Sequence, residues 1–251
     1  MKKIIRPFSA AVVWIALWFI LAYLVGKEVL LPSPADAAKT LLYLMRQEYF
    51  WQYCFSSVLR IITGLLAGIA AGSILAIATR KKNFAASLFL PLLSVIRATP
   101  VASFIILAFV WIGKGSVPAF TSFLMVLPII HNAVSVGIQS IDSELLEMTS
   151  LFRFSLPERL RYLYIPSVLP SFTSGLNTSL GLAWKAGIAA EVICSPEYGI
   201  GTALKDSKTY LNTSELFAWT AAVIIISMLL EKGLGALTAK LSKKYERKAA
   251  E

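Results

Sequence analysis

The sequence predicts an all-α membrane protein with a six-helix transmembrane bundle. Two observations carry this prediction. Of the 251 residues, 57% are hydrophobic and only 15% are charged, whereas a soluble domain averages about 45–50% apolar and about 25% charged residues. The apolar residues also gather into stretches of about 20, the length of a helix that crosses a bilayer. This composition excludes a disordered chain, a disulfide scaffold and a coiled coil.

The apolar stretches divide a single transmembrane domain, residues 1–251, into six spans. The first, Phe8–Gly26, is too long for the core of a signal peptide, and the A-x-A-like Ala35-Asp36-Ala37 lies far beyond it. We therefore expect it to be retained. A short helix on the membrane surface should follow, capped by Ser33 or Asp36. The six predicted spans are about 8–26, 56–79, 84–112, 117–137, 167–192 and 216–237.

The third stretch, residues 84–112, is too long for one plain span and contains Arg97-Ala98-Thr99-Pro100. Proline removes a backbone donor and disfavours helix in the residue before it. We therefore expect a helix that is broken near mid-membrane, between residues 97 and 100. Gly113-Lys114-Gly115-Ser116 follows and should face the outside. It lacks the GxxxxGK[ST] spacing of a phosphate-binding loop.

The distribution of lysine and arginine sets the predicted orientation. A net charge of +10 fits either a nucleic-acid partner or the cytoplasmic rim of a membrane protein. With the N-terminus in the cytoplasm, 15 of the 24 basic residues lie inside, 6 outside and 3 within spans. Arg80-Lys81-Lys82 is one of the inside clusters. This bias predicts that both termini are cytoplasmic, and its division among membrane-edge clusters excludes nucleic acid.

Gly64, Gly68 and Gly72 recur at every fourth residue of the second span. Glycines at this spacing line one helix face and let a neighbouring backbone approach closely, which is a main source of helix association within lipid. They predict a compact bundle and carry no information about a solute.

Motifs for catalysis or metal binding do not occur in the sequence. There is no GxSxG and no HExxH. The single histidine, His131, and the widely separated Cys54 and Cys194 cannot assemble an ordinary structural zinc site. We therefore expect that the chain is not an enzyme, does not hydrolyse ATP and holds no cofactor or metal.

Polar residues inside the spans are the candidates for a solute pathway, because ionisable groups in a bilayer are costly and are functional candidates by default. Lys185 and Glu191 are six residues apart in the fifth span, so they do not share a helix face. Two structural alternatives stay open: an ion pair between Arg97 and Glu191, and interhelical hydrogen bonds by residues 177–179. Two cations would favour an anionic solute. The pathway candidates are Arg97, Thr99, Pro100, Asn177, Trp184, Lys185 and Glu191.

The stretch 139–166 is unusual for a cytoplasmic connector, because its apolar residues recur at helical spacing. Leu145, Met148 and Phe152 do so, and Pro157 can open a second helix at its first turn. We expect two short helices, joined by a turn, whose exposed apolar side requires a partner. The alternative is a loop that folds against its own bundle.

This stretch resembles the "EAA" loop of permease subunits in bacterial ABC importers, whose pattern is E-A-A-x3-G-x9-I-x-L-P. Here the chain reads Glu147-Met148-Thr149, three residues, Arg153, nine residues, Leu163, one residue and Ile165-Pro166. The spacing matches throughout. Two positions depart: residues 148 and 149 are not alanine, and Arg153 replaces the glycine, which is strained if the turn there needs φ > 0.

The resemblance extends over about residues 55–240 to the nitrate/sulfonate/taurine-type permeases, a branch that also includes permeases for pyrimidine precursors of thiamine. The residues that carry it are Ser94–Pro100, Trp111–Gly115, Gly181–Trp184, Ala190-Glu191 and Tyr198–Gly201.

The resemblance implies a six-helix permease of the type I ABC importer kind in a bacterial inner membrane. Two copies, as a homodimer, would form the pathway at their interface. Two separate ATPase subunits, which bind the ATP and magnesium, would each receive one loop as a coupling helix. An external binding protein would deliver a small polar or anionic solute such as a sulfonate, taurine, nitrate or a thiamine-precursor pyrimidine. The implied ATPase-docking residues are Glu147, Leu151, Phe152, Arg153, Leu163, Ile165 and Pro166.

The runner-up is a self-contained secondary transporter or channel. Many secondary transporters are built from inverted repeats, and the first half of this sequence does not mirror the second. A membrane scaffold without transport activity would leave Arg97 and Lys185 unexplained.

Overall fold

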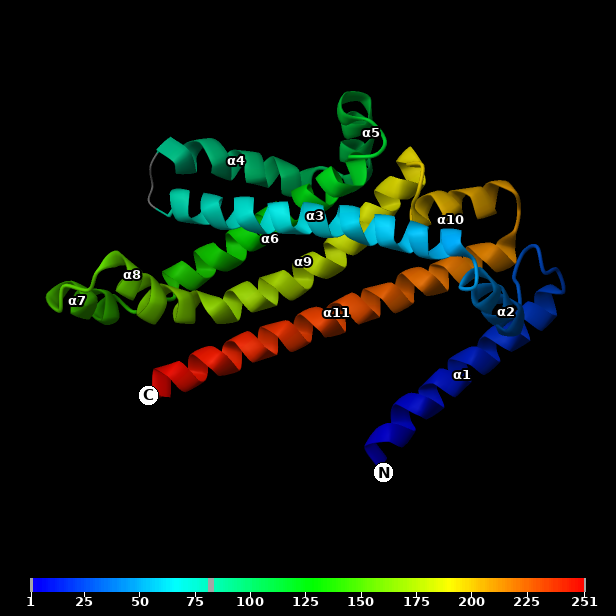
Figure 1. Cartoon of the computed structure of the whole chain (residues 1–251), viewed down its shortest axis with the longest axis horizontal. Helices are drawn as coiled ribbons and strands as arrows, with labels where there is room; N and C mark the ends of the chain where they lie inside the picture. Colours follow the sequence, from blue (N-terminus) through cyan, green and yellow to red (C-terminus); the bar gives the residue numbers. More distant parts are fainter. Residues whose placement is uncertain (1, 81–83, 251) are drawn as a thin grey trace.

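The computed structural model describes residues 2–80 and 84–250, and within these ranges every regular element is a helix (Figure 1). Lys81 and Lys82, which the charge distribution assigned to the cytoplasm, lie outside the described residues, as do the two end residues of the predicted domain. The elements are α1 (Lys2–Val25), α2 (Pro34–Leu44), α3 (Glu48–Ala78), α4 (Phe84–Ala98), α5 (Val101–Ile112), α6 (Val117–Gln139), α7 (Ser143–Leu151), α8 (Leu156–Arg159), a π-helical segment η1 (Leu160–Tyr164), α9 (Ile165–Cys194), α10 (Ile200–Thr209) and α11 (Thr213–Ala250).

Helices α3, α6 and α9 form the centre of the bundle, and α6 packs along both of the others. The apolar cluster between them takes Ile61 from α3, Ile130 from α6 and Ala183 from α9, each with no exposed surface. Inside a bilayer, where lipid tails are as apolar as leucine, such contacts stabilise the bundle through close van der Waals packing.

The glycine stripe of α3 faces α6. A Cβ atom on Gly64 would lie 2.1 Å from the carbonyl oxygen of Ala119, and one on Gly68 would lie 2.7 Å from Cβ of Val126. Gly72 approaches the carbonyl oxygen of Leu127 in the same way, at 2.7 Å. Because no side chain fits in these gaps, the two backbones approach one another as the spacing of the glycines predicts.

Helix α11 closes one side of the centre, where it packs on α2, α9 and α10. Trp184 of α9 is buried, and its indole N–H donates to the carbonyl oxygen of Val223 at 3.2 Å. Trp219 of α11 is also buried and stacks on Phe50, with ring centroids 4.9 Å apart. A buried tryptophan needs a partner for its N–H, so Trp184 holds α9 and α11 in a fixed register.

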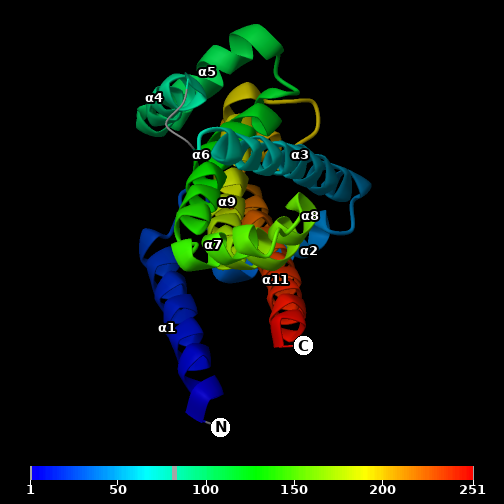
Figure 2. The same ribbon diagram turned by 90° about the vertical axis from the view of Figure 1, so that its left-hand side faces the viewer.

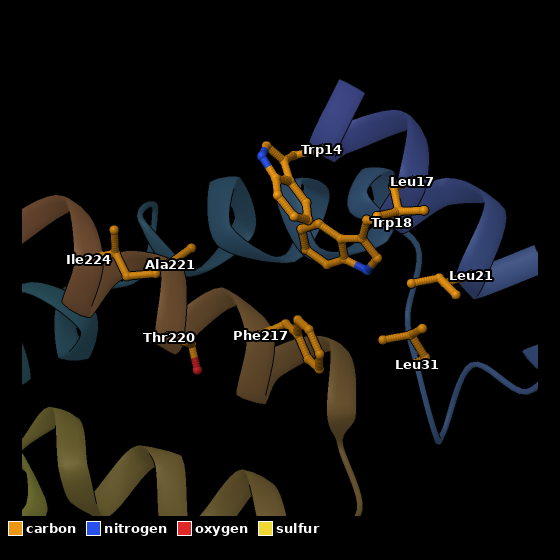
Figure 3. A pocket seen from close by; sticks show the side chains of 9 residues that line it. All are labelled: Trp14, Leu17, Trp18, Leu21, Leu31, Phe217, Thr220, Ala221 and Ile224. Carbon is orange, nitrogen blue, oxygen red and sulfur yellow. The ribbon is translucent and has the colours of Figure 1, made fainter. Parts of the chain in front are cut away.

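Helix α1 leaves the bundle and points away from it (Figures 1 and 2). Trp18 joins it to the rest of the chain: its indole N–H donates to the carbonyl oxygen of Pro32 at 3.1 Å, and its ring lies 5.5 Å from that of Phe217. A groove of about 430 Å³, lined almost entirely by apolar side chains, separates α1 from α11 (Figure 3).

Three helices are long and apolar enough to cross a bilayer within the described ranges: α3, α6 and residues Thr213–Lys240 of α11. A bent pair, α4 with α5, brings the number to four if it counts as one span. Helix α9 has 30 residues, but polar residues such as Asn177 and Lys185 interrupt its apolar sequence. The predicted count of six spans remains a prediction.

The break in the third predicted span falls where the proline placed it. Helix α4 ends at Ala98, α5 begins at Val101, and the two axes differ by 109°. The hydroxyl of Thr99 donates to the carbonyl oxygen of Val95 at 2.8 Å, and Pro100 is the N-cap of α5. A bend this large turns α5 across the direction of α4.

Candidate functional site

The stretch 139–166 folds as two short helices, α7 and α8, followed by η1. Asp142 is the N-cap of α7, and its carboxylate accepts from the backbone N–H of Glu144 at 2.9 Å. Ser155 and Glu158 form a capping box on α8, in which the backbone N–H and the hydroxyl of Ser155 both donate to the Glu158 carboxylate at 2.7 Å. These two donors hold the pKa of Glu158 below its usual value. Side-chain caps of this kind satisfy donors at a helix start that have no partner within the helix.

The turn between α7 and α8 explains why a glycine suits position 153. Arg153 has φ = +52°. The N–H of Phe154 donates to the carbonyl oxygen of Thr149 at 2.9 Å, and the N–H of Arg153 donates to that of Ser150 at 3.1 Å. This pair of bonds is a Schellman motif, which places its left-handed residue just after the helix. The turn therefore does need φ > 0, and Arg153 adopts it at a cost in backbone strain.

Arg159 ties the two short helices together. Its Nε donates to the carbonyl oxygen of Phe154 at 3.1 Å, and its Nη2 donates to the carbonyl oxygen of Thr149 at 3.3 Å. These contacts place a positive charge at the C-terminal end of α7, where the helix dipole favours it. The two helices and their turn therefore behave as one folded unit.

The apolar side of this unit does not pack on the bundle. Leu151 is 79% exposed, Phe152 66% and Leu156 77%. Among the docking residues that the resemblance implies, Leu163 is buried and Pro166 half-buried, so these two attach the loop to the bundle, whereas the other five are exposed. The exposed side does not fit a loop folded against its own bundle, and an exposed apolar surface of this kind is a candidate interaction site.

The base of the loop joins α9 and α3. Residues 156–194 are helical without interruption, so η1 continues directly into α9. Tyr164 in η1 accepts a hydrogen bond from Nη1 of Arg80 at 2.9 Å, and the Arg80 guanidinium lies 5.6 Å from the centre of the Tyr164 ring. Arg80 follows the last residues of α3, so this contact links the end of α3 to the start of α9.

Pathway candidates on α9 fall on two faces. Asn177, Thr178 and Lys185 are exposed on one face, which no helix covers among the residues that the structure describes. Trp184 and Glu191 point into the bundle and are buried. Arg97, Thr99 and Pro100 lie on a different element, at the bend between α4 and α5, with Arg97 and Pro100 exposed and Thr99 half-buried.

Glu191 sits in a closed polar cluster at the other end of α9. Its carboxylate accepts from the hydroxyl of Ser57 at 2.7 Å, from Nη1 of Arg60 at 3.2 Å and from the backbone N–H of Gly201 at 3.0 Å. The Ser57 hydroxyl also accepts from the N–H of Ile200 at 2.9 Å. Side chains of α3 and α9 thus accept hydrogen bonds from the first N–H groups of α10. They do so because the N-cap of α10, Gly199, has no side chain of its own.

The alternative of an ion pair between Arg97 and Glu191 is wrong, because Glu191 pairs with Arg60. Arg60 and Ser57 are the residues that the sequence reading missed. Arg60 lies inside a predicted span, so the rule that singled out Lys185 applies to it equally. Ser57 gives no such signal, because a lone serine in an apolar helix is common.

Comparison with known proteins gives the family to which this chain is similar. The profile of the family described as "binding-protein-dependent transport system inner membrane component" matches residues 64–246, well over half of the chain. That match agrees with the resemblance drawn from the loop and the flanking segments.

Three relatives match over nearly the whole chain. The taurine transport system permease protein of Escherichia coli K12 is 24% identical over 96% of this chain and 90% of its own length. The putative aliphatic sulfonates transport permease protein of Bacillus subtilis 168 is 24% identical over 97% and 87%. The nitrate import permease protein of Synechocystis PCC 6803 is 25% identical over 92% and 86%.

Proposed function

The chain belongs to the family of binding-protein-dependent transport system inner membrane components, and we propose that it is the permease subunit of an ATP-binding-cassette importer, coupled to a separate ATPase through residues 139–166. A transport permease of this kind is not an enzyme. ATP and magnesium would bind in the ATPase subunits, two of them in each transporter.

The observation that carries this proposal is a rigid loop with an unpaired apolar side. Its two helices are capped and tied together by Arg159, and Leu151 and Phe152 project from them into solvent. A groove on an ATPase that receives these side chains would bury their apolar surface. Because α8 and η1 continue into α9 without a break, a push on the loop would move α9 directly.

The exposed face of α9 supports a solute pathway between two copies of this chain. Asn177, Thr178 and Lys185 share that face and point away from the bundle. Uncovered polar groups are costly against lipid, so they call for another protein surface or for water. A homodimer that brings two α9 helices to face one another across the pathway supplies both.

The solute that this pathway fits best is small and anionic. Lys185 would place one positive charge in the pathway from each copy, and Arg97 is exposed at the α4–α5 bend. The relatives are named for taurine, aliphatic sulfonates and nitrate. Taurine and the sulfonates carry a sulfonate group, and nitrate is itself an anion. An extracytoplasmic binding protein would select the solute and deliver it.

In the proposed orientation both termini and the 139–166 loop lie in the cytoplasm of a bacterial cell, with the permease in its inner membrane, and the bias of lysine and arginine supports this orientation. Lys185 then lies within the bilayer, and α10 lies on the outer side. This orientation puts the exposed loop in the compartment that contains the ATPase.

The test is to purify the protein from its native membranes in mild detergent and to identify co-purifying proteins by mass spectrometry. We expect an ATP-binding-cassette ATPase to be recovered with the wild-type chain and lost with Phe152→Asp, which places a charge on the apolar side of the loop.

Tyr210→Asp is the matched control. Tyr210 is also an exposed aromatic residue, at 81% against 66% for Phe152, but it lies at the end of α10, far from the loop (Figure 1). This variant should retain the ATPase. Purification of the wild-type chain as a self-contained oligomer with no ATPase, even after crosslinking, would instead favour a secondary transporter.

A further inference from the structure

We propose that α3 and α9 form a brace that is pinned at both ends, and that this brace carries a displacement of the 139–166 loop to α10 on the opposite side of the membrane. The pin at the loop end is the contact of Arg80 with Tyr164. The pin at the α10 end is the contact of Ser57 and Arg60 with Glu191. All five are positioning residues. The inference rests on the proposed function, in which the loop is the part that the ATPase moves.

The loop-end pin joins two elements that the sequence separates by more than 80 residues. Arg80 donates to the Tyr164 hydroxyl at 2.9 Å and lies within cation–π range of its ring, at 5.6 Å from the ring centre. Beside it, Thr79 contacts Nε2 of His131 on α6 at 2.9 Å. The end of α3 is therefore attached by polar side chains to both the loop and α6.

The pin at the α10 end joins α3, α9 and α10 around one carboxylate. Glu191 has no exposed surface. A charge taken out of water this completely depends on its partners, and these come from Ser57 and Arg60 on α3 and from Gly201 on α10. Arg60 also donates to the carbonyl oxygen of Tyr198, in the turn that leads into α10.

Gly199 and Gly201, at the start of α10, pack closely against Glu191. A Cβ atom on Gly199 would lie 2.8 Å from Oε2 of Glu191, and one on Gly201 would lie 2.3 Å from its Cβ. Since the first turn of α10 lies directly against Glu191, a movement of α9 at this point displaces α10 with it.

Between the pins, α3 is a single helix. From Arg60 to its end at Ala78 the helix rises about 27 Å, close to the thickness of the hydrocarbon core. The glycine stripe packs this length of α3 closely on α6, so α3 resists sliding independently of α6. Coupling between distant sites needs rigid elements joined by specific contacts. The brace has that form, with one pin at each face of the membrane.

The test follows α10 while the loop is moved by ATP. Lys208→Cys places a reactive thiol on the exposed side of α10, where Lys208 is open to solvent, whereas the native Cys54 and Cys194 are buried. The labelling rate with a membrane-impermeant maleimide is measured in proteoliposomes that contain the permease–ATPase complex, with and without ATP. We expect ATP to change this rate in the otherwise wild-type chain.

The loop-end variants should reduce that change severalfold without releasing the ATPase. Tyr164→Phe keeps the ring and removes the hydroxyl that Arg80 binds, and Arg80→Ala removes the donor. Both should still bind the ATPase and hydrolyse ATP, while solute transported per ATP falls about threefold to tenfold, as expected for the loss of one charge-assisted hydrogen bond. Arg80→Lys, which keeps the charge and a donor, should recover part of the transport.

Tyr162→Phe is the matched control, because Tyr162 is in the same segment but its ring lies beside Arg161, 5.5 Å from the guanidinium. It should behave as wild type. Ser57→Ala weakens the other pin, and its combination with Tyr164→Phe should be no worse than the more impaired single variant, since either break releases the same brace.

An ATP-dependent change in Lys208→Cys labelling that is undiminished in both loop-end variants would overturn the brace, and so would a wild-type complex in which ATP leaves the labelling unchanged. The importer assignment stands in both of these cases, because the ATPase is bound. It fails separately if no ATPase co-purifies with the wild-type chain.

Discussion

Arg60 and Glu191 form an ion pair of 3.2 Å in which the carboxylate has no solvent exposure, whereas the guanidinium side chain is 22% exposed. The pair joins α3 to α9 across 131 positions of sequence. Its asymmetry matters, because the arginine retains access to water when the glutamate is removed, but the glutamate has only its partners.

Removal of one member of this pair should destabilise the protein. Arg60→Ala leaves the Glu191 charge buried without its cation, and breaking a buried pair from one side costs about 3 kcal/mol. We expect a lower melting temperature in detergent, measured by differential scanning fluorimetry. Arg46→Ala, which removes an arginine outside the cluster, serves as the comparison, and equal melting temperatures for the two variants would show that the pair does not stabilise the fold.

Arg153→Gly should stabilise the turn between α7 and α8. A non-glycine residue in the left-handed region costs about 1 kcal/mol, and glycine removes that cost. Slower amide hydrogen exchange at the end of α7 would report the gain. Arg153→Ala separates backbone strain from loss of the charge, since alanine keeps the Cβ atom. If alanine and glycine slow exchange equally, strain is not the cause.

Gly64→Ala should disrupt the packing of α3 on α6. The added Cβ atom would meet the carbonyl oxygen of Ala119 at 2.1 Å, a backbone atom that cannot move aside alone, and overpacking of this kind costs about 1–3 kcal/mol. We expect reduced accumulation in the membrane and a lower melting temperature. Gly233→Ala, at a helical glycine with open space around it, should have neither effect.

The capping box of α8 should make the loop sensitive to acid. Ser155 lowers the pKa of Glu158 in the folded loop, so the carboxylate contributes stability above its unfolded pKa, and this contribution is lost as the pH falls through the folded pKa. The loop should therefore be unaffected near neutral pH and should loosen only below about pH 4. Hydrogen exchange in α8 measures this, and Glu158→Gln should remove the pH dependence.

Lys185→Ala should reduce uptake of anionic solutes without loss of the assembled protein. Lys185 is exposed on α9, so its removal leaves no buried partner unsatisfied, and the effect should be confined to transport. Uptake of radiolabelled taurine, an alkanesulfonate and nitrate in proteoliposomes provides the measurement. Lys205→Ala, on α10, is the control, and unchanged uptake of every anion by Lys185→Ala would exclude this lysine from the pathway.

The local features of this protein could be read from its sequence with good accuracy. The break at Thr99 and Pro100 follows from the missing backbone donor of proline, and the turn at Arg153 is what the resemblance of the loop to the E-A-A-x3-G pattern implies. The helix start at Ser33 follows from a side chain that caps the backbone three residues ahead. Each depends on atoms within about five residues of one another, so a linear sequence contains what is needed.

The contacts between helices could not be read in this way. The stripe of Gly64, Gly68 and Gly72 predicted a closely packed neighbouring helix, but only the fold identified this helix as α6. Glu191, a carboxylate within a predicted span, indicated that a cation lies beside it. The sequence left Arg97 open as this partner, whereas in the fold the partner is Arg60. Helical periodicity fixes which residues share a face, and it leaves open which other face lies opposite.

The sequence by itself therefore determined the membrane class, the broken third stretch, the two-helix loop and the family. The tertiary structure alone decided that Glu191 holds α10 against α3 and that Tyr164 meets Arg80. The physical reason is one of range. Hydropathy, proline and caps act through neighbours in the chain, whereas a buried charge is stabilised by whichever donors the packing of distant helices brings within hydrogen-bond distance.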